Sequence, residues 1–127
     1  MAEFVSRAGQ KLDHALSAFG LDVSGKTCVV YDDIISTGGS INEIVDALLA
    51  HGARPEITVA CTHAVFSGNA VERLSRPEIA ELIVTDTIPL PPEKRLPKTV
   101  VLSVASLFAE AIKRIWTDDS VSSLFDA

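Results

Sequence analysis

The feature that most limits what this chain can fold into is the alternation of two hydrophobic periodicities along its length. Four short runs are rich in β-branched residues and show no polar alternation, which is typical of strands covered on both faces. These runs are Thr27–Tyr31, Ile57–Cys61, Leu82–Thr85 and Thr99–Ser103. Apolar residues at helical spacing form stripes over residues 12–19, 41–49 and 107–115. The two patterns together indicate helices that alternate with strands.

Such alternation is typical of right-handed βαβ units, in which each crossover returns the chain to a parallel neighbouring strand. We therefore expect an α/β fold, a three-layer α/β/α sandwich with a mainly parallel sheet of about four strands. A chain of 127 residues is expected to form one domain, 1–127. The stretch Ile88–Lys98 contains four prolines and is expected to be an extended, exposed loop with solvated basic side chains.

Composition narrows the partners and the location. The net charge of −6 argues against a general nucleic-acid surface, which needs clustered lysine and arginine. No apolar run approaches the roughly 18 residues of a membrane span, and the N-terminus lacks a signal-peptide pattern. The sequence thus predicts a cytoplasmic protein without a membrane partner. Cys28 and Cys61 lie in apolar runs without metal-ligand spacing, so we expect reduced, buried thiols.

The segment after the first expected strand joins two carboxylates to a loop of small residues. The residues are Asp32 and Asp33, followed by Ser36, Thr37, Gly38, Gly39 and Ser40. Backbone N–H groups of such a loop, and the N-terminus of the helix that follows, suit one phosphate. Two carboxylates repel phosphate but suit the vicinal hydroxyls of a sugar or a Mg²⁺ ion. The segment predicts a sugar-phosphate site with Mg²⁺ as a possible cofactor at the aspartates; the alternative is a capped Gly-Gly-Ser turn.

The sequence "VVYDDIISTGGSI" resembles the phosphoribosyl-pyrophosphate signature of type I phosphoribosyltransferase folds. It is most similar to the ribose-phosphate diphosphokinases, also called phosphoribosyl pyrophosphate synthetases. The stretches "THAVFSGNAVERL", "ELIVTDTIPL" and "VVLSVASLFAEAIKRIWTDDSVSSLF" resemble consecutive segments of that family's C-terminal half. The resemblance, from about Gly25 to Phe125, implies a phosphoribosyltransferase-like core over 27–127. It also implies that Asp32 and Asp33 contact ribose hydroxyls and that Ser36–Ser40 holds the 5-phosphate.

The beginning of the chain suggests a different origin. "EFVSRAGQKLDHALSAFGLDVSGKTC" resembles the haemolysin-like ribosomal-RNA methyltransferases, which have a Rossmann-type core that uses S-adenosylmethionine. We therefore expect a chimera, engineered or recombined, with a methyltransferase-like helix and link over 1–26 and a junction near Ser24–Thr27. Lys11 matches the first lysine of that family's catalytic tetrad, but the later members have no counterparts, which argues against methyl transfer.

The expected function is binding of ribose 5-phosphate, phosphoribosyl pyrophosphate or phosphate, with weak or no turnover. The resemblance to the diphosphokinases lacks their ATP-binding half and their basic catalytic loop, so no catalytic residue is assigned. Two alternatives stay open: a folded structural chimera without a ligand, and an S-adenosylmethionine-binding fragment. A monomer or a homodimer is expected.

Four further positions carry expectations of their own. His63 follows a strand and is expected to have a hydrogen-bonding role rather than to act as a general base. Asp86 either faces the pocket or caps the turn before Pro89. Ser67 is expected to cap a helix, and the Val121–Phe125 patch is either a docking surface or a frayed end.

Overall fold

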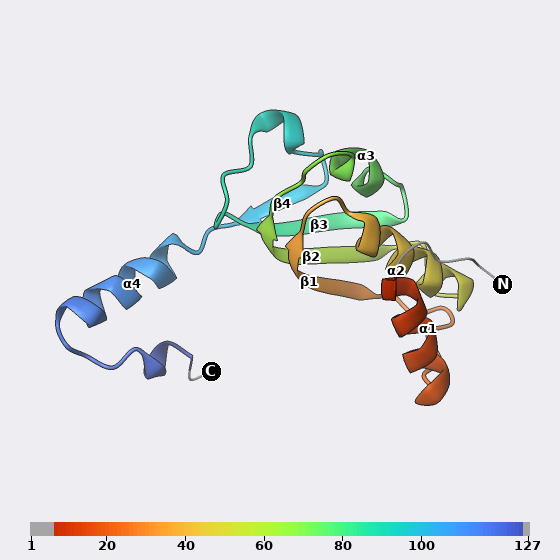
Figure 1. Ribbon diagram of the computed structural model, residues 1–127, viewed down its shortest axis with the longest axis horizontal. Coiled ribbons are helices and arrows are strands. Elements are labelled where there is room, and N and C mark those ends of the chain that lie inside the picture. The colour runs from red at the N-terminus through yellow and green to blue at the C-terminus, as the bar shows by residue number, and fades with distance from the viewer. Residues whose placement is uncertain (1–6, 126–127) are drawn as a thin grey trace.

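The structure, a computed structural model, describes residues 7–125 as strands and helices in alternation (Figure 1). Glu3–Ser6, the start of the methyltransferase-like segment, lie outside the described residues. The elements are α1 (Arg7–Ala18), β1 (Val29–Ile35), α2 (Gly39–Ala50), β2 (Ile57–Ala64), α3 (Ala70–Leu74), β3 (Ile79–Thr85), η1 (Pro92–Lys94), β4 (Thr99–Leu102), α4 (Ala105–Trp116) and η2 (Ser122–Leu124). Within the described range, no helix is both long and apolar enough to cross a membrane.

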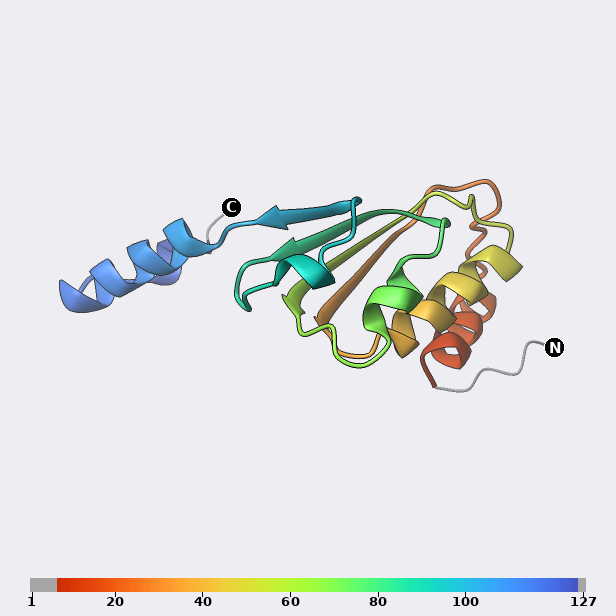
Figure 2. The same ribbon diagram turned by 90° about the horizontal axis from the view of Figure 1, so that it is seen from above.

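The sheet has four strands in the order β1-β2-β3-β4, and every neighbouring pair is parallel. The prediction of an α/β fold with a parallel sheet of about four strands is confirmed. Because the strands follow one another in a single direction and such crossovers are right-handed, all the connections must pass over the same face of the sheet. Figure 2 shows this arrangement, with α2 and α3 on one face and α1 beside α2.

The expected third layer is not formed by the described residues. α1 packs against α2, where the His51 Nε2 atom lies 2.7 Å from Asp13 Oδ1. α4, which follows β4, runs away from the sheet (Figures 1 and 2). Within residues 7–125, the opposite face of the sheet therefore carries no helix, and Val29 and Tyr31 of β1 are 70% and 69% exposed there.

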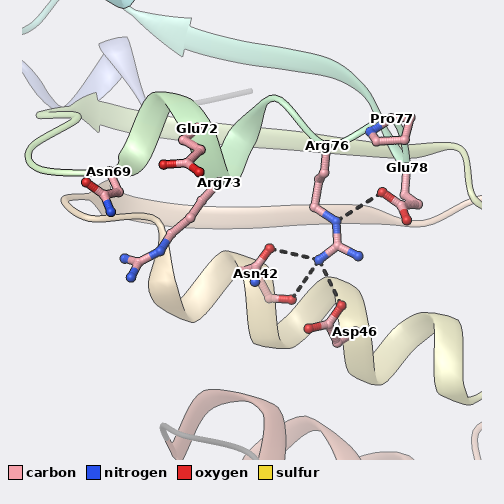
Figure 3. A pocket seen from close by; sticks show the side chains of 8 residues that line it. All are labelled: Asn42, Asp46, Asn69, Glu72, Arg73, Arg76, Pro77 and Glu78. Atoms are coloured by element: carbon pink, nitrogen blue, oxygen red, sulfur yellow. Dashed lines mark hydrogen bonds and ion pairs between the residues drawn. The ribbon is translucent and has the colours of Figure 1, made fainter.

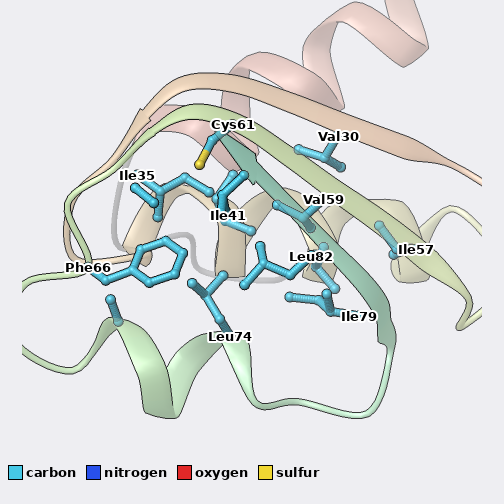
Figure 4. Packing of buried hydrophobic residues seen from close by; sticks show 14 of the residues in the cluster. Val30, Ile35, Ile41, Ile57, Val59, Cys61, Phe66, Leu74, Ile79 and Leu82 are labelled. Carbon is cyan, nitrogen blue, oxygen red and sulfur yellow. The ribbon is translucent and has the colours of Figure 1, made fainter. Parts of the chain in front are cut away.

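The hydrophobic core lies between the covered face of the sheet and the helices α2 and α3 (Figure 4). Aliphatic side chains dominate it, as the composition predicts, and Phe66 is the largest fully buried side chain. Within the described part of the chain, no polar or charged residue is classed as buried. Cys28 and Cys61 are both free thiols, and burial raises the pKa of Cys61 to about 11, so it stays protonated at neutral pH.

The prediction of a solvated loop over Ile88–Lys98 was wrong for two of its basic side chains, those of Lys94 and Lys98. Lys94 Nζ donates to the Val65 carbonyl at 3.1 Å, and Lys98 Nζ donates to the Ile79 carbonyl at 2.7 Å. Leu90 in the same loop is buried in the core. This crossover contains only the short helix η1, so lysine ammonium groups, rather than helix packing, fasten it to the covered face.

Truncating the core should cost far more stability than truncating an exposed apolar side chain. We expect Leu82→Ala, at a fully buried position, to lower the free energy of unfolding by about 2–5 kcal/mol. Phe19→Ala, at a side chain that is 77% exposed, should change it by less than about 0.5 kcal/mol. Urea unfolding monitored by far-UV circular dichroism measures both. Equal losses would contradict the core described here.

Candidate functional site

The loop between β1 and α2 surrounds a cavity of about 120 Å³ at the carboxyl edge of the sheet. A water molecule takes up about 30 Å³ in the liquid, so the cavity has room for a group the size of one phosphate. The expected site residues that line it are Asp32, Ser36, Thr37, Gly38, Gly39 and Ser40; Ile34, Ile35 and Ile41 complete the wall. The structure thus brings six of the seven expected residues together.

Asp33 is the expected site residue that does not line this cavity. It is exposed, and its Oδ1 atom accepts a hydrogen bond from the Ile34 backbone N–H at 3.0 Å. Successive side chains of a strand point to opposite faces, and here Asp32 lines the cavity while Asp33 does not. A ligand that used both carboxylates would have to extend beyond the cavity.

Gly38 sets the direction in which the loop enters α2. Its φ of 73° lies in the left-handed region, and a Cβ atom there would meet the Ala70 Cα atom of α3 at 3.6 Å. The first hydrogen bond of the helix runs from Asn42 N to the Gly38 carbonyl at 3.0 Å. The N–H groups before Asn42 have no partner within the helix and form its positive end. This end of α2 contributes to the cavity through Gly39, Ser40 and Ile41.

The segment between β2 and α3 holds the loop from the other side. Ser36 and Ser67 are joined twice, through their hydroxyls at 2.9 Å and through the Ser67 N–H and the Ser36 carbonyl at 2.9 Å. Arg73 of α3 donates from Nη1 to the Thr37 carbonyl at 2.9 Å. Figure 3 shows the Arg73 side chain extended toward the beginning of α2.

Sequence reasoning missed both of these contacts. Ser67 was expected to cap a helix, but α3 has Asn69 at its N-cap without a side-chain cap, so that prediction was wrong. Arg73 stands on a short helix in a charged stretch, and nothing in its local sequence distinguishes it. The one available signal was topological, since crossovers that follow adjacent parallel strands meet at the same edge of the sheet.

The Asp32 carboxyl group is held in an unfavourable environment for its charge. Partial burial raises the pKa of Asp32, and the neighbouring Asp33 carboxyl raises it further, whereas the Ile34 N–H opposes the shift. Such a group gains most from a positive or hydrogen-donating partner.

The two aspartates are of the donor type that Mg²⁺ prefers, because their carboxylate oxygens are hard ligands. Among residues 7–125, however, no group of three or more histidine, cysteine, aspartate or glutamate side chains is placed to hold an ion. A bound Mg²⁺ would therefore take most of its ligands from water and from the bound molecule.

A larger hollow of about 500 Å³ lies between α2 and α3 (Figure 3). The Arg76 side chain in this hollow is already neutralised, by Asp46 Oδ1 at 2.8 Å and Glu78 Oε2 at 3.1 Å. Its Nη1 atom also donates to Asn42 Oδ1 at 2.8 Å. These contacts join α2 to the chain before β3, so the hollow is a structural junction rather than a second anion site.

Two other expectations are settled by direct contacts. His63 has a hydrogen-bonding role, as expected, with Nδ1 at 2.8 Å from Thr87 Oγ1. Asp86 caps the start of α4 rather than the turn before Pro89, because its Oδ1 atom accepts the Val104 N–H at 2.8 Å. Hydrogen bonds from Ser103 and from the Val104 N–H lower the pKa of Asp86.

These features define an α/β protein that presents a candidate anion-binding loop at the carboxyl edge of a parallel sheet. The chain belongs to the family described as the phosphoribosyl synthetase-associated domain, whose model matches residues 3–126.

The relatives and a solved structure agree with this assignment. A ribose-phosphate pyrophosphokinase of Gloeobacter violaceus is 52% identical over 104 residues, which cover 82% of this chain and 31% of that protein. The enzyme of the same name from Clostridium acetobutylicum is 44% identical over 119 residues, or 94% of this chain and 37% of the relative. The phosphoribosylpyrophosphate synthetase of Mycobacterium smegmatis superposes with a TM-score of 0.73 at 42% identity, covering 76% of this chain and 32% of that one.

These matches change two earlier expectations. The family match over residues 3–126 runs through the expected junction near Ser24–Thr27, and nothing in the comparisons indicates a methyltransferase segment. The chain spans about a third of the length of the relatives it matches. The placement of that third in the C-terminal half of the synthetases is not confirmed.

The two adjacent glycines of the loop should respond oppositely to alanine. Gly38→Ala should destabilise the protein by about 1–2 kcal/mol, because alanine is strained at a φ of 73°. Gly39→Ala should leave stability unchanged or raise it by up to about 1 kcal/mol. Gly39 begins a helix, and its added Cβ would meet Thr37 Oγ1 at an ordinary 3.6 Å. Chemical unfolding of the pair measures this, and equal effects would contradict the described loop.

The raised pKa of Asp32 predicts a pH-dependent gain from Asp32→Asn. The native state holds the Asp32 proton more tightly than the unfolded chain does, so the ionised carboxylate destabilises the fold above its folded pKa. In buffer without phosphate or Mg²⁺, we expect Asp32→Asn to raise Tm by roughly 2 °C at neutral pH and to have no effect near pH 3.

Asp22 supplies a control of the opposite sign. Hydrogen bonds from Ser24, chiefly its backbone N–H, lower the pKa of Asp22, so its charge stabilises the fold at neutral pH. Asp22→Asn should lower Tm at neutral pH, and this effect should fade as the pH falls from the ordinary pKa of 3.8 through the lowered folded pKa. Thermal scans of both variants across this range provide the test. A loss of stability in Asp32→Asn at neutral pH would contradict the environment described for Asp32.

Proposed function

We propose that the chain binds ribose 5-phosphate, phosphoribosyl pyrophosphate or inorganic phosphate at the loop between β1 and α2. The phosphate lies in the cavity formed by Ser36–Ser40, and the ribose hydroxyls bind to Asp32 and, beyond the cavity, to Asp33. The observation that carries this proposal is that Asp32 and all five loop residues line one cavity at the N-terminus of α2.

The physical chemistry of the two halves of the site supports this orientation. The first N–H groups of a helix and a loop of small residues favour a phosphate dianion. The aspartates repel that charge but accept hydrogen bonds from hydroxyl groups, so the sugar end of the ligand belongs on their side. A ribose hydroxyl donating to Asp32 would also relieve the unfavourable ionisation that burial and Asp33 impose on it.

Family membership supports the same choice of ligand. The relatives bear the name ribose-phosphate pyrophosphokinase, and the solved neighbour is a phosphoribosylpyrophosphate synthetase. We extend the ligand class to this chain, with Asp32 and Asp33 as the residues that would hold Mg²⁺. Such an ion would neutralise charge between the sugar and the phosphates.

We propose weak or no diphosphokinase turnover for the 127-residue chain by itself. Phosphoryl transfer depends on cations placed around the moving group. Arg73 lies at the loop but is bound to the Thr37 carbonyl, and Arg76, which contacts α2 further along, is paired with two carboxylates. The S-adenosylmethionine alternative and a chimeric origin for residues 1–26 receive no support from the comparisons.

Two ligands separate the phosphate half of the site from its sugar half. In an amide NMR titration, we expect both inorganic phosphate and ribose 5-phosphate to shift resonances concentrated at residues 36–41. The variant Asp32→Asn with Asp33→Asn should lose about tenfold or more in affinity for ribose 5-phosphate, because hydrogen bonds to charged groups contribute about 1.5–3 kcal/mol each. Its affinity for inorganic phosphate should be equal or higher, since two negative charges are gone.

A matched control is available in the same chain. Asp118→Asn with Asp119→Asn makes the same change in charge at an adjacent pair beyond the end of α4. This double variant should bind both ligands like the unmodified chain. The absence of shifts with either ligand would overturn the proposal. Shifts with phosphate alone, or equal losses in the two double variants, would overturn the assignment of the aspartates to the sugar.

A further inference from the structure

Three successive carbonyl groups of the loop after β1 are bound from the same side. All their partners come from residues 65–73, which join β2 to α3 and are called the clamp segment below. The bonds run from Val65 N and Phe66 N to Ile35 O at 3.1 and 3.2 Å, from Ser67 N to Ser36 O at 2.9 Å, and from Arg73 Nη1 to Thr37 O at 2.9 Å. The clamp segment therefore fixes the orientation of three neighbouring peptide groups.

This orientation turns three N–H groups toward the other side of the loop. A trans peptide group is planar, and its N–H points opposite to its C=O. The described residues contain no cis peptide bond, so the N–H groups of Ser36, Thr37 and Gly38 point away from the clamp segment. The cavity lies on that side, since its described lining residues fall between Asp32 and Ile41 and include none from the clamp segment. Successive N–H groups turned to one side form a concavity that favours an anion.

The third of these peptide groups is bound in a different way from the other two. Backbone N–H groups bind the Ile35 and Ser36 carbonyls, whereas a side chain, that of Arg73, binds the Thr37 carbonyl. Turning over the peptide between Thr37 and Gly38 would change chiefly the ψ of Thr37 and the φ of Gly38. Gly38 has a φ of 73°, and glycine adopts φ values of either sign readily. A turned peptide would direct its carbonyl oxygen at the cavity and repel a bound phosphate.

The clamp segment has a firm base in the core. Phe66 has a φ of 47°, which is uncommon for a bulky residue, and its side chain is fully buried. Ala70 and Leu74 anchor α3 in the same core. A backbone strained in this way persists only where the surrounding contacts determine it. The Arg73 side chain thus reaches the loop from a part of the structure that is itself fixed.

We infer that Arg73 is a positioning residue for the anion site. By binding the Thr37 carbonyl, it keeps the Gly38 N–H directed at the cavity. Arg73 does not line the cavity; it lies alongside Gly38 and Gly39 on the other side of the loop (Figure 3). The ligand class in this inference rests on the proposed function, whereas the orientation of the peptide does not. The apparent affinity for phosphate falls with the fraction of molecules whose peptide has the binding orientation.

Substitution of Arg73 tests the effect on binding. Arg73→Met removes the guanidinium group and keeps a side chain of similar reach. In an amide NMR titration with inorganic phosphate, we expect roughly tenfold weaker binding, the loss of about one N–H hydrogen bond to a charged group. Arg73→Lys keeps a donor and the charge and should restore most of the affinity. Arg73 is exposed, so both variants should keep the Tm of the unmodified chain.

Two controls separate positioning from the charge of the guanidinium group. Arg54→Met removes the same charge from an exposed arginine in the connection after α2, where Arg54 pairs with Glu56, and should leave phosphate affinity unchanged. In ~1 M NaCl, charges are screened beyond about 3 Å. The ratio of affinities between the unmodified chain and Arg73→Met should persist there. A ratio that disappears in this salt would show that Arg73 acts through its charge alone and would overturn the inference.

The orientation of the peptide is measured without any ligand. The nuclear Overhauser effect between the Thr37 Hα and Gly38 amide protons depends on the ψ of Thr37, which changes when the peptide turns over. We expect this effect to change in Arg73→Met and to match the unmodified chain in Arg73→Lys. An unchanged effect in Arg73→Met would overturn the inference, even if phosphate binds the loop. Absence of phosphate binding to the unmodified chain would instead overturn the proposed function, and with it the binding role of Arg73, while this measurement still decides whether Arg73 orients the peptide.

Discussion

Each strand of the sheet is added on the same side of the strand before it, and this order governs the rest of the structure. With the order β1-β2-β3-β4 and right-handed crossovers, every connection passes over the same face of the sheet. The hydrophobic core therefore lies on that face, from Val30 on β1 to Val84 on β3. The same constraint leaves the opposite face to be covered by something other than a crossover. The carboxyl ends of the parallel strands also meet at one edge, where the connections that follow β1 and β2 come into contact.

The candidate site arises from that meeting of two crossovers. The loop after β1 forms the cavity, and the segment after β2 holds the loop in place through Ser67 and Arg73. Gly38 allows the left-handed turn by which the loop enters α2. The ionised Asp32 works against stability in the same place, as is common where a site is shaped for a charged or polar ligand. This destabilisation is confined to the site, because the buried core beneath the loop is apolar.

Family membership accords with the candidate site and says nothing about the uncovered surfaces. The chain matches about a third of the length of the synthetases it resembles, and this third contains the acidic pair and the loop. In the described residues, the helix α4 and one face of the sheet lack partners.

Much of this protein was determined by the sequence alone, because the deciding interactions are local. Hydrophobic periodicity predicted the parallel α/β sheet, and the Asp-Asp and Ser-Thr-Gly-Gly-Ser spacing predicted the six residues that gather at one cavity. The positive φ of Gly38 follows from a tight turn into a helix. The resemblance of the chain to the synthetases led to the family that the comparisons show, although the similarity of its beginning to methyltransferases led to a junction that they do not support.

Only the tertiary structure decided which side chains meet across the fold. It separated Asp33 from the cavity that Asp32 lines, placed Ser67 and Arg73 on the loop, and bound the lysines of the Pro-rich crossover to carbonyl groups. It also left one face of the sheet open, although the strand patterns predicted strands covered on both faces. A buried pattern in the sequence records that a side chain avoids water. It does not say which element supplies the cover, because that depends on contacts between residues that are distant in the sequence.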